Sequence, residues 1–328
     1  MTSDSLSNKP QSQSGGKPLV TFQSRSLRGL VSVNIATLFF GLAGVLGKLS
    51  GLPAPVITLG RVVFSGIALG IIVALTHVTL RPRSRQDLVL LVTQGIILAI
   101  HWTAFFQSIV VSSVAIGLLS FSSFPLFTAA LEPRLLGQRP RRIEIVAALL
   151  ILPGVYLLAP HISLASRATQ GVLWGLLAGA TFALLSVVNR GLARRYPALT
   201  IGLYQDSVAA LALLPTLLLT TLSVALTARS LLILLVLGVV CTALAHTLFI
   251  AGLKDVRAQI ASLIAALEPV WGIGFATLLL GEIPSGLTLL GGALILLSSA
   301  LPGLAALRGE PAHARKGRSL HNWRNRPS

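Results

Sequence analysis

The sequence predicts an all-α polytopic membrane protein, with ten transmembrane helices arranged as two inverted five-helix repeats. Of its 328 residues, 54% are apolar and only 11% are charged, and the mean hydropathy is +0.83. A soluble domain carries about 25% charged residues. Lipid must therefore be the solvent for most of this chain. A similarity between the two halves of the sequence predicts the repeats.

The ten spans follow from the apolar runs, because a helix needs about 20 apolar residues to cross the hydrocarbon core. The runs of this kind are 29–49, 54–78, 88–110, 112–131, 143–159, 170–189, 198–222, 230–252, 257–280 and 285–304. Residues 1–28 are polar and predict a disordered tail, since no short apolar segment there adjoins a small-residue cleavage site. The basic residues 305–328 predict a second tail, which lies against anionic lipid.

The halves 29–160 and 170–304 resemble each other at an offset of 144 residues. This offset aligns three landmarks, Pro125 with Pro269, Gly137 with Gly281 and Pro140 with Pro284. Five spans per copy is an odd number, so the second copy starts on the opposite side of the membrane and is inverted. Inverted repeats with interrupted helices are the architecture of secondary transporters, which hold the substrate near the midplane.

The cationic residues predict the orientation. With the N-terminus in the cytoplasm, 22 of the 26 Lys and Arg residues fall on the inner side, and the outer loops hold only Lys48, Arg167 and Arg229. This is a positive-inside pattern, so both termini are expected in the cytoplasm of a cell with the protein in its inner or plasma membrane. The net charge of +17 sits in short loops and tails, which argues against a nucleic-acid partner.

Several chemistries are excluded. The single cysteine, Cys241, rules out an internal disulfide and argues against a soft-metal cluster. The chain contains no Walker-type Gly-Lys-Ser/Thr, His-Glu-x-x-His or Gly-x-Ser-x-Gly arrangement, so we expect neither ATP hydrolysis nor an enzyme. No cofactor and no metal are predicted. The expected partners are a small-molecule substrate and membrane lipids, with a homodimer left open.

Three charged residues fall inside predicted spans, namely Arg61, Asp206 and Glu268. Intramembrane charges usually face a bundle interior or a water-filled cavity. The Arg61 guanidinium suits a carboxylate or phosphate on the substrate; its alternatives are a structural acid partner or snorkelling to the interface. Glu268 and Asp206 are candidates for proton coupling. The alternatives are a neutral hydrogen-bonded acid for Glu268 and a pair with a loop arginine such as Arg194 for Asp206.

Other polar and aromatic side chains complete the predicted substrate site: His101, Trp102, His246 and Trp271. His246 aligns with Trp102 at the repeat offset, so the two are expected at similar depths. Imidazole can relay protons and indole can contact a ring or a cation, whereas ordinary helix–helix contacts are the plainer alternative. Pro125 and Pro269 are expected to break their helices, since proline removes one helical hydrogen bond.

These residues resemble the drug/metabolite transporter superfamily, in particular its EamA-type members. The features that carry the resemblance are the two five-helix repeats, Arg61 in Thr58-Leu59-Gly60-Arg61, the prolines Pro125 and Pro269, and Leu279-Leu280-Gly281-Glu282. The first repeat departs from the pattern at Gln138, where the family usually has Glu. The resemblance implies a carrier of small organic solutes, commonly an exporter of amino acids or other metabolites.

The leading hypothesis is thus a secondary transporter that works by alternating access. A flippase or carrier of lipid-linked or phosphorylated cargo is the alternative, because it shares the architecture and would use Arg61 for the phosphate. A membrane sensor is disfavoured, since the tails are too short to be signalling domains.

Overall fold

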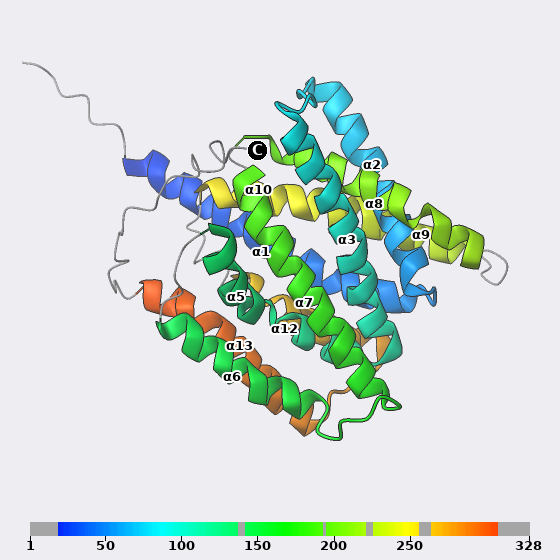
Figure 1. Cartoon of the computed structure of the whole chain (residues 1–328), viewed down its shortest axis with the longest axis vertical. Coiled ribbons are helices and arrows are strands. Elements are labelled where there is room, and N and C mark those ends of the chain that lie inside the picture. The colour runs from blue at the N-terminus through cyan, green and yellow to red at the C-terminus, as the bar shows by residue number, and fades with distance from the viewer. Residues whose placement is uncertain (1–18, 137–141, 193–194, 221–225, 256–263, 308–328) are drawn as a thin grey trace, which may run out of the picture.

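A computed structural model of the chain describes residues 19–136, 142–192, 195–220, 226–255 and 264–307, and every regular element within them is helical (Figure 1). The first half contains α1 (Leu19–Leu49), α2 (Ala54–Thr76), α3 (Arg85–Val111), α4 (Val114–Phe121), α5 (Phe124–Leu136) and α6 (Arg142–Leu158). The second half contains α7 (Arg167–Leu192), α8 (Ala198–Thr220), α9 (Ala228–Gly238), the π-helical η1 (Val239–Leu244), α10 (Ala245–Asp255), α12 (Glu268–Leu280) and α13 (Gly286–Leu307).

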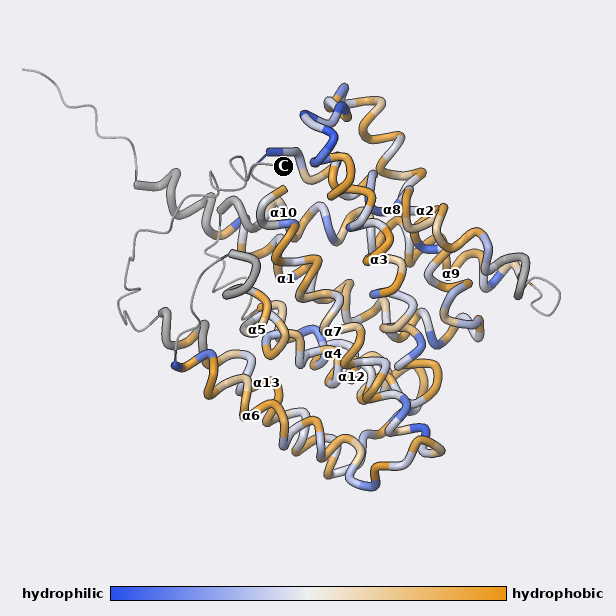
Figure 2. Tube along the Cα trace, in the orientation of Figure 1, coloured by the Kyte–Doolittle hydropathy of each residue, from blue (hydrophilic) through white to orange (hydrophobic). Residues whose placement is uncertain are grey.

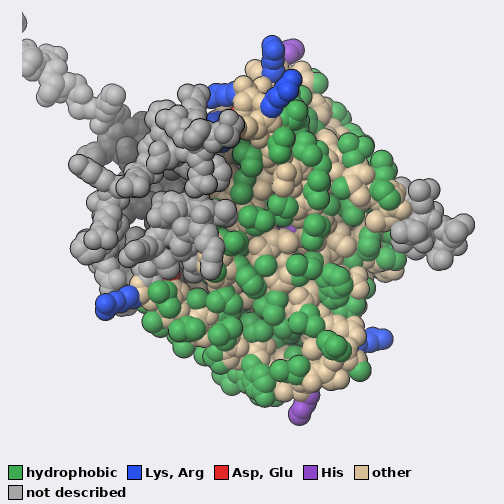
Figure 3. Space-filling view, viewed as in Figure 1, with side chains coloured by type: hydrophobic (Ala, Val, Ile, Leu, Met, Phe, Trp, Pro, Cys, Tyr) green, Lys and Arg blue, Asp and Glu red, His purple; other side chains and the backbone are tan. Residues whose placement is uncertain are grey.

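The described helices are those of a multi-pass membrane protein. Six are long and apolar enough to cross a membrane: Leu27–Leu49, Ala54–Thr76, Arg85–Val111, Arg167–Asn189, Ala198–Thr216 and Ala228–Phe249. Shorter apolar helices lie at Val114–Thr128, Glu268–Leu280 and Gly286–Leu301. Apolar residues run along most of the trace (Figure 2), and the face in Figure 3 is largely apolar, with Lys and Arg at its margins. Such a surface matches lipid rather than water.

Three elements differ from the expected spans. α1 begins at Leu19, inside the segment 1–28 that the sequence analysis assigned to a tail. The expected helix 112–131 is two helices, α4 and α5, and the expected helix 230–252 contains the π-helical turn η1. The tail 305–328 and Gln138 lie largely or wholly outside the described residues, as does the first part of the span 257–280.

Polar caps fix several helix ends. The Ser84 hydroxyl accepts a hydrogen bond from the Asp87 amide at 3.1 Å, and Ser113 accepts one from the Ile116 amide at 3.2 Å. These bonds satisfy amides that have no partner within the helix. α12 ends at Leu280 and is capped by Gly281, whose φ of +67° is the left-handed conformation typical of a glycine at a helix C-terminus.

The helix pairs follow the repeat: replacing each helix of a packed pair by its counterpart in the other half gives another packed pair. α1 packs on α10 and α12, and their repeat counterparts pack in the same way, α7 on α3 and on α5. α3 packs on α8 as α9 packs on α2, whereas α2–α8 and α6–α13 each pair two counterparts. The α3–α7 and α6–α13 pairs are visible in Figure 1. Most of the packing therefore joins one half of the chain to the other, around an approximate twofold relation.

Both copies also break at equivalent residues. α4 ends at Phe121 and α5 begins at Phe124, and a turn at residues 266–267 precedes α12, which begins at Glu268. The Ser123 amide donates to the Ser120 carbonyl at 3.2 Å, and its repeat counterpart, the Leu267 amide, donates to the Ile264 carbonyl at 2.9 Å. The expected breaks thus occur just before Pro125 and Pro269, each of which lacks an N–H.

Candidate substrate site

Arg61 on α2 is buried inside the bundle, with 3% of its surface exposed. Its Nε donates to the Thr242 hydroxyl at 3.0 Å. Its Cζ lies 3.6 Å from the centroid of the Trp102 ring and 5.2 Å from that of Phe106. The guanidinium is therefore stacked in a cation–π contact. Among the described residues no carboxylate lies within ion-pair distance of Arg61.

Glycines allow this approach of α9 and η1 to α2. A Cβ at Gly238 would lie 2.7 Å from the Arg61 carbonyl oxygen, and one at Gly60 would lie 2.6 Å from a Leu234 methyl carbon. Because neither glycine carries a side chain, the two backbones come close enough for Thr242 to reach Arg61. Small residues serve this purpose widely in membrane helix pairs.

Thr242 is a site residue that the sequence analysis did not select. Its hydroxyl accepts from Arg61 and donates to the Leu237 carbonyl at 2.7 Å, five residues earlier. A π-helical turn places such groups where a regular helix would not, and π-turns are frequent at functional sites. The available signal was a hydroxyl within the apolar run 230–252, but serine and threonine often bond only to their own helix backbone.

His246 lies next to Trp102, its counterpart in the repeat. The two ring centroids are 5.6 Å apart with the rings edge to face, and His246 is 5.4 Å from the Phe40 ring. Trp102 thus contacts both Arg61 and His246. The structure therefore brings together three of the predicted residues, at the contact of α2, α3 and the helix formed by η1 and α10.

His101 faces a different helix. Its Nδ1 lies 2.9 Å from the Ala178 carbonyl on α7 and 3.4 Å from the Thr181 hydroxyl. A carbonyl only accepts, so Nδ1 carries the hydrogen. Its ring packs among those of Phe105, Phe121 and Phe182. The adjacent residues His101 and Trp102 therefore point toward opposite neighbours of α3.

Asp206 on α8 lies near Arg61 without touching it. Only 4% of its surface is exposed, and its Oδ2 accepts from the Ser65 hydroxyl at 2.6 Å. Ser65 is one turn beyond Arg61 on α2, so the same face of α2 carries both polar contacts. Arg194, the partner considered for Asp206, lies outside the described residues.

Glu268 opens α12 at the second helix break and is half-buried. α1 approaches it at Gly41, where a Cβ would lie 2.8 Å from the Glu268 carbonyl oxygen and 2.8 Å from the Gly272 amide nitrogen. Trp271 is 42% exposed, and within the described part of the chain it makes no ring contact with the Arg61 group. α12 therefore presents Glu268 and Trp271 in different surroundings.

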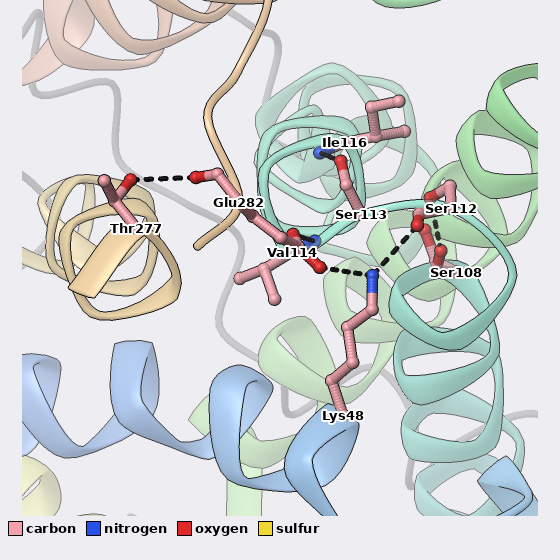
Figure 4. Close-up of polar contacts among 8 residues, drawn as sticks. All are labelled: Lys48, Ser108, Ser112, Ser113, Val114, Ile116, Thr277 and Glu282. Atoms are coloured by element: carbon pink, nitrogen blue, oxygen red, sulfur yellow. Dashed lines mark hydrogen bonds and ion pairs between the residues drawn. The ribbon is translucent and has the colours of Figure 1, made fainter. Parts of the chain in front are cut away.

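A cluster joins the two halves at the end of the bundle where α1 finishes (Figure 4). Lys48 and Glu282 form an ion pair at 2.5 Å. Lys48 also donates to the Ser112 carbonyl at 2.9 Å, and Glu282 accepts from the Val114 amide at 2.9 Å. A cation thus meets the C-terminus of α3 and an anion meets the N-terminus of α4, as the helix dipoles favour.

A second cluster lies at the opposite end of α3. Asp87 pairs with Arg195 at 2.5 Å and accepts from the Tyr196 hydroxyl at 2.7 Å. The Tyr196 oxygen also accepts from the Arg83 amide at 2.7 Å. Burial, together with the Asp87 carboxylate, raises the pKa of the Tyr196 phenol. This cluster fastens the α2–α3 loop to the α7–α8 loop, beside helices that already pack along their length.

An apolar multi-pass bundle that is built from two related halves with interrupted helices is typical of membrane transporters. Comparison with known families agrees, since the EamA-like transporter family matches residues 27–159 and again 169–302. The chain belongs to this family. It is a transporter and not an enzyme.

Two relatives are similar to this chain over most of their length. The uncharacterized transporter YwfM of Bacillus subtilis is 27% identical over 292 residues, which is 88% of this chain and 96% of the relative. The pseudopaline exporter CntI of Pseudomonas aeruginosa PAO1 is 26% identical over 274 residues, 82% of this chain and 94% of the relative. One solved crystal structure, 22% identical, has a TM-score of 0.63 over 88% of this chain and 99% of its own chain, which shows a shared fold.

Proposed function

We propose that this transporter carries a small carboxylated solute, an amino acid or a related metabolite, out of the cell by alternating access. One observation carries the proposal: Arg61 is 3% exposed, its guanidinium bonds to a threonine hydroxyl and stacks on aromatic faces, and among the described residues no acid lies within ion-pair distance of it. A buried charge without an ionic partner is costly. A substrate carboxylate would supply that partner, and an arginine fork binds it in two-point geometry.

The contacts of Arg61 weigh against its two alternative roles. A structural ion pair would place an acid within 4 Å, whereas Asp206 bonds to Ser65 and no described acid pairs with Arg61. Snorkelling would extend the side chain to an interface, whereas its Nε is held by Thr242 inside the bundle. Trp102, stacked on the guanidinium, would then pack against an apolar or aromatic part of the solute.

The remaining parts of the proposal concern topology, direction and energy. Ten crossings in two inverted repeats, with both termini in the cytoplasm of the inner or plasma membrane, account for the exchange-symmetric packing and the positive-inside pattern. Export is supported by the similarity to a relative named as an exporter. The cell's ion gradient would drive it, with Glu268 and Asp206 as the acids that bind and release a proton.

Counterflow in proteoliposomes tests this function, because exchange against a preloaded solute needs no knowledge of the coupling ion. Amino acids and organic acids form the panel, and wild type is compared with Arg61→Ala. Arg229→Ala, which removes an exposed arginine, is the matched control. We expect saturable exchange of a carboxylated solute that Arg61→Ala abolishes and Arg229→Ala retains.

Three other results would contradict parts of the proposal. Exchange that survives in Arg61→Ala would leave a carrier in which Arg61 has no anchoring role. Exchange confined to amines or neutral solutes would contradict the proposal that the substrate carries a carboxylate. No exchange by monodisperse wild type, together with movement of a lipid-linked phosphate in a scramblase-type assay, would favour the flippase alternative.

A further inference from the structure

The ion pair of Lys48 with Glu282 lies at the end of the bundle where α1 finishes, farther toward that end than Arg61. Lys48 lies in the last turn of α1 and Glu282 follows α12, and these two helices pack on each other. Both side chains reach across to the backbone of the α3–α4 link, Lys48 to the Ser112 carbonyl and Glu282 to the Val114 amide. The four groups therefore tie the α1–α12 pair to the α3–α4 link (Figure 4).

An apolar layer lies directly beneath this cluster. A Cβ at Gly44 would lie 3.0 Å from the Ile109 Cδ1 atom, and one at Gly47 would overlap the Phe106 ring. Ile109 and Phe106 are both fully buried. Because these two glycines carry no side chains, α1 packs closely against Ile109 and Phe106 of α3.

The layers follow one face of α3. Ser112, Ile109, Phe106 and Trp102 are spaced three, three and four residues apart, which is the spacing of one helical face. Ser112 contacts Lys48 of the ion pair, and Ile109 contacts Gly44 of α1. Phe106 lies at the edge of the Arg61 site, and Trp102 stacks on the Arg61 guanidinium. A solute that approaches Arg61 from this end between α1 and α3 has to part these helices and so break the bonds of Lys48 and Glu282 to the α3–α4 link.

The repeat gives this cluster no charged counterpart. The offset of 144 aligns Lys48 with Leu192 and Glu282 with Gln138, so the other copy carries neither the cation nor the anion. Two symmetric gates of equal strength would require both pairs. The Lys–Glu pair therefore has no copy at the repeat-related position, and the ion pair that the described residues form at the other end of α3, Asp87 with Arg195, joins different elements.

We propose that Lys48 and Glu282 form an outer gate, whose ion pair holds the transporter closed to the outside and biases it toward states open to the cytoplasm. This inference rests on the proposed topology and alternating access. An exporter gains from such a bias, because its empty site then faces the compartment that supplies the solute. The pair is only partly exposed, at 25% and 22%, and its two bonds to helix ends add to its strength.

Accessibility of Ile109 tests the gate without any substrate. In a Cys241→Ala background, Ile109→Cys is labelled in intact cells with a membrane-impermeant maleimide. Leu164→Cys on the expected outer loop marks full labelling, and His77→Cys on an expected inner loop marks none. We expect slow labelling of Ile109→Cys, and labelling roughly fivefold faster or more when Lys48→Met or Glu282→Gln is added, the scale expected for a partly exposed ion pair with charge-assisted hydrogen bonds.

Two further variants separate a gate from general loosening. The double variant Lys48→Met with Glu282→Gln should label as fast as either single variant, because both act through one contact. Lys48→Arg should remain slow. The carboxamide oxygen that Glu282→Gln introduces can still accept from the Val114 amide, so this variant is expected to fold, which its unfolding midpoint in detergent checks.

Unchanged labelling in both single variants would overturn the gate, as would strictly additive rates in the double variant. These outcomes are independent of counterflow. A protein that moves no solute but labels as expected would retain the gate and lose the proposed substrate, and the reverse result would retain the substrate and lose the gate.

Discussion

Replacing Thr242 with valine tests whether the position of Arg61 matters for solute binding. Valine has almost the shape of threonine, so the change opens no cavity, but it removes the oxygen that accepts from Arg61 Nε at 3.0 Å. Thr242 is 1% exposed and Arg61 3% exposed, so water replaces the lost acceptor poorly. A hydrogen bond to a charged group contributes about 1.5–3 kcal/mol.

The effect should appear in affinity more than in maximal rate. A loss of about 1.4 kcal/mol is tenfold in binding, so the half-saturating concentration in counterflow should rise about tenfold or more in Thr242→Val. The guanidinium would still stack on Trp102, and exchange should persist at high solute concentration. Thr242→Ser keeps the oxygen and should stay within about twofold of wild type.

The assay is saturable counterflow of whichever carboxylated solute the panel identifies, with the unfolding midpoint of each variant measured in parallel. Equal half-saturation in wild type, Thr242→Val and Thr242→Ser would refute the positioning role. A fall in stability with no change in half-saturation would assign the bond to folding alone.

The other predictions concern helix packing and the Asp87 ion pair. Gly41→Ala places a Cβ 2.8 Å from backbone atoms of α12 and should lower the free energy of unfolding by about 1–3 kcal/mol, whereas Gly66→Ala, where a Cβ would meet nothing within 4 Å, should be neutral or stabilising by up to about 1 kcal/mol; equal midpoints in denaturing detergent would contradict the close approach. Asp87→Asn should lower the free energy of unfolding by about 1–2 kcal/mol, and the loss should shrink at high salt because the Arg195 side chain is 45% exposed; a loss that salt leaves unchanged would assign it to the Tyr196 contact.

Many of the helices and their breaks could be predicted from the sequence because each depends on a short stretch of neighbouring residues. Apolar run length marks the helices, and a proline marks a missing hydrogen bond, so the breaks before Pro125 and Pro269 were expected and occur. The offset of 144 residues also placed Trp102 and His246 at similar depths, and their rings are in contact.

The missing parts are those that depend on which helix faces which. In a membrane both the lipid and the bundle interior accept apolar side chains, so hydropathy gives no direction to a helix face. The contacts between Arg61 and Trp102 and between Lys48 and Glu282 join residues far apart in the chain, and neither pairing follows from spacing. The sequence likewise did not predict that His101 and Trp271 lie in surroundings different from those of Arg61.

The π-helical turn η1 has a consequence for how this chain tolerates change in length. A π-turn contains one residue more than the α-helix that it interrupts. The wider turn accommodates this extra residue, so deleting one residue within 239–244 would restore a regular helix and leave its two flanks in nearly the same relative orientation. After a deletion in η1, Leu234 would therefore still pack on α2 and His246 would still lie beside Trp102. In a regular α-helix each residue advances about 100° around the axis. A one-residue deletion at this turn would thus be better tolerated than one in the regular helix between Leu234 and η1, which would rotate Leu234 and His246 relative to each other by about 100°.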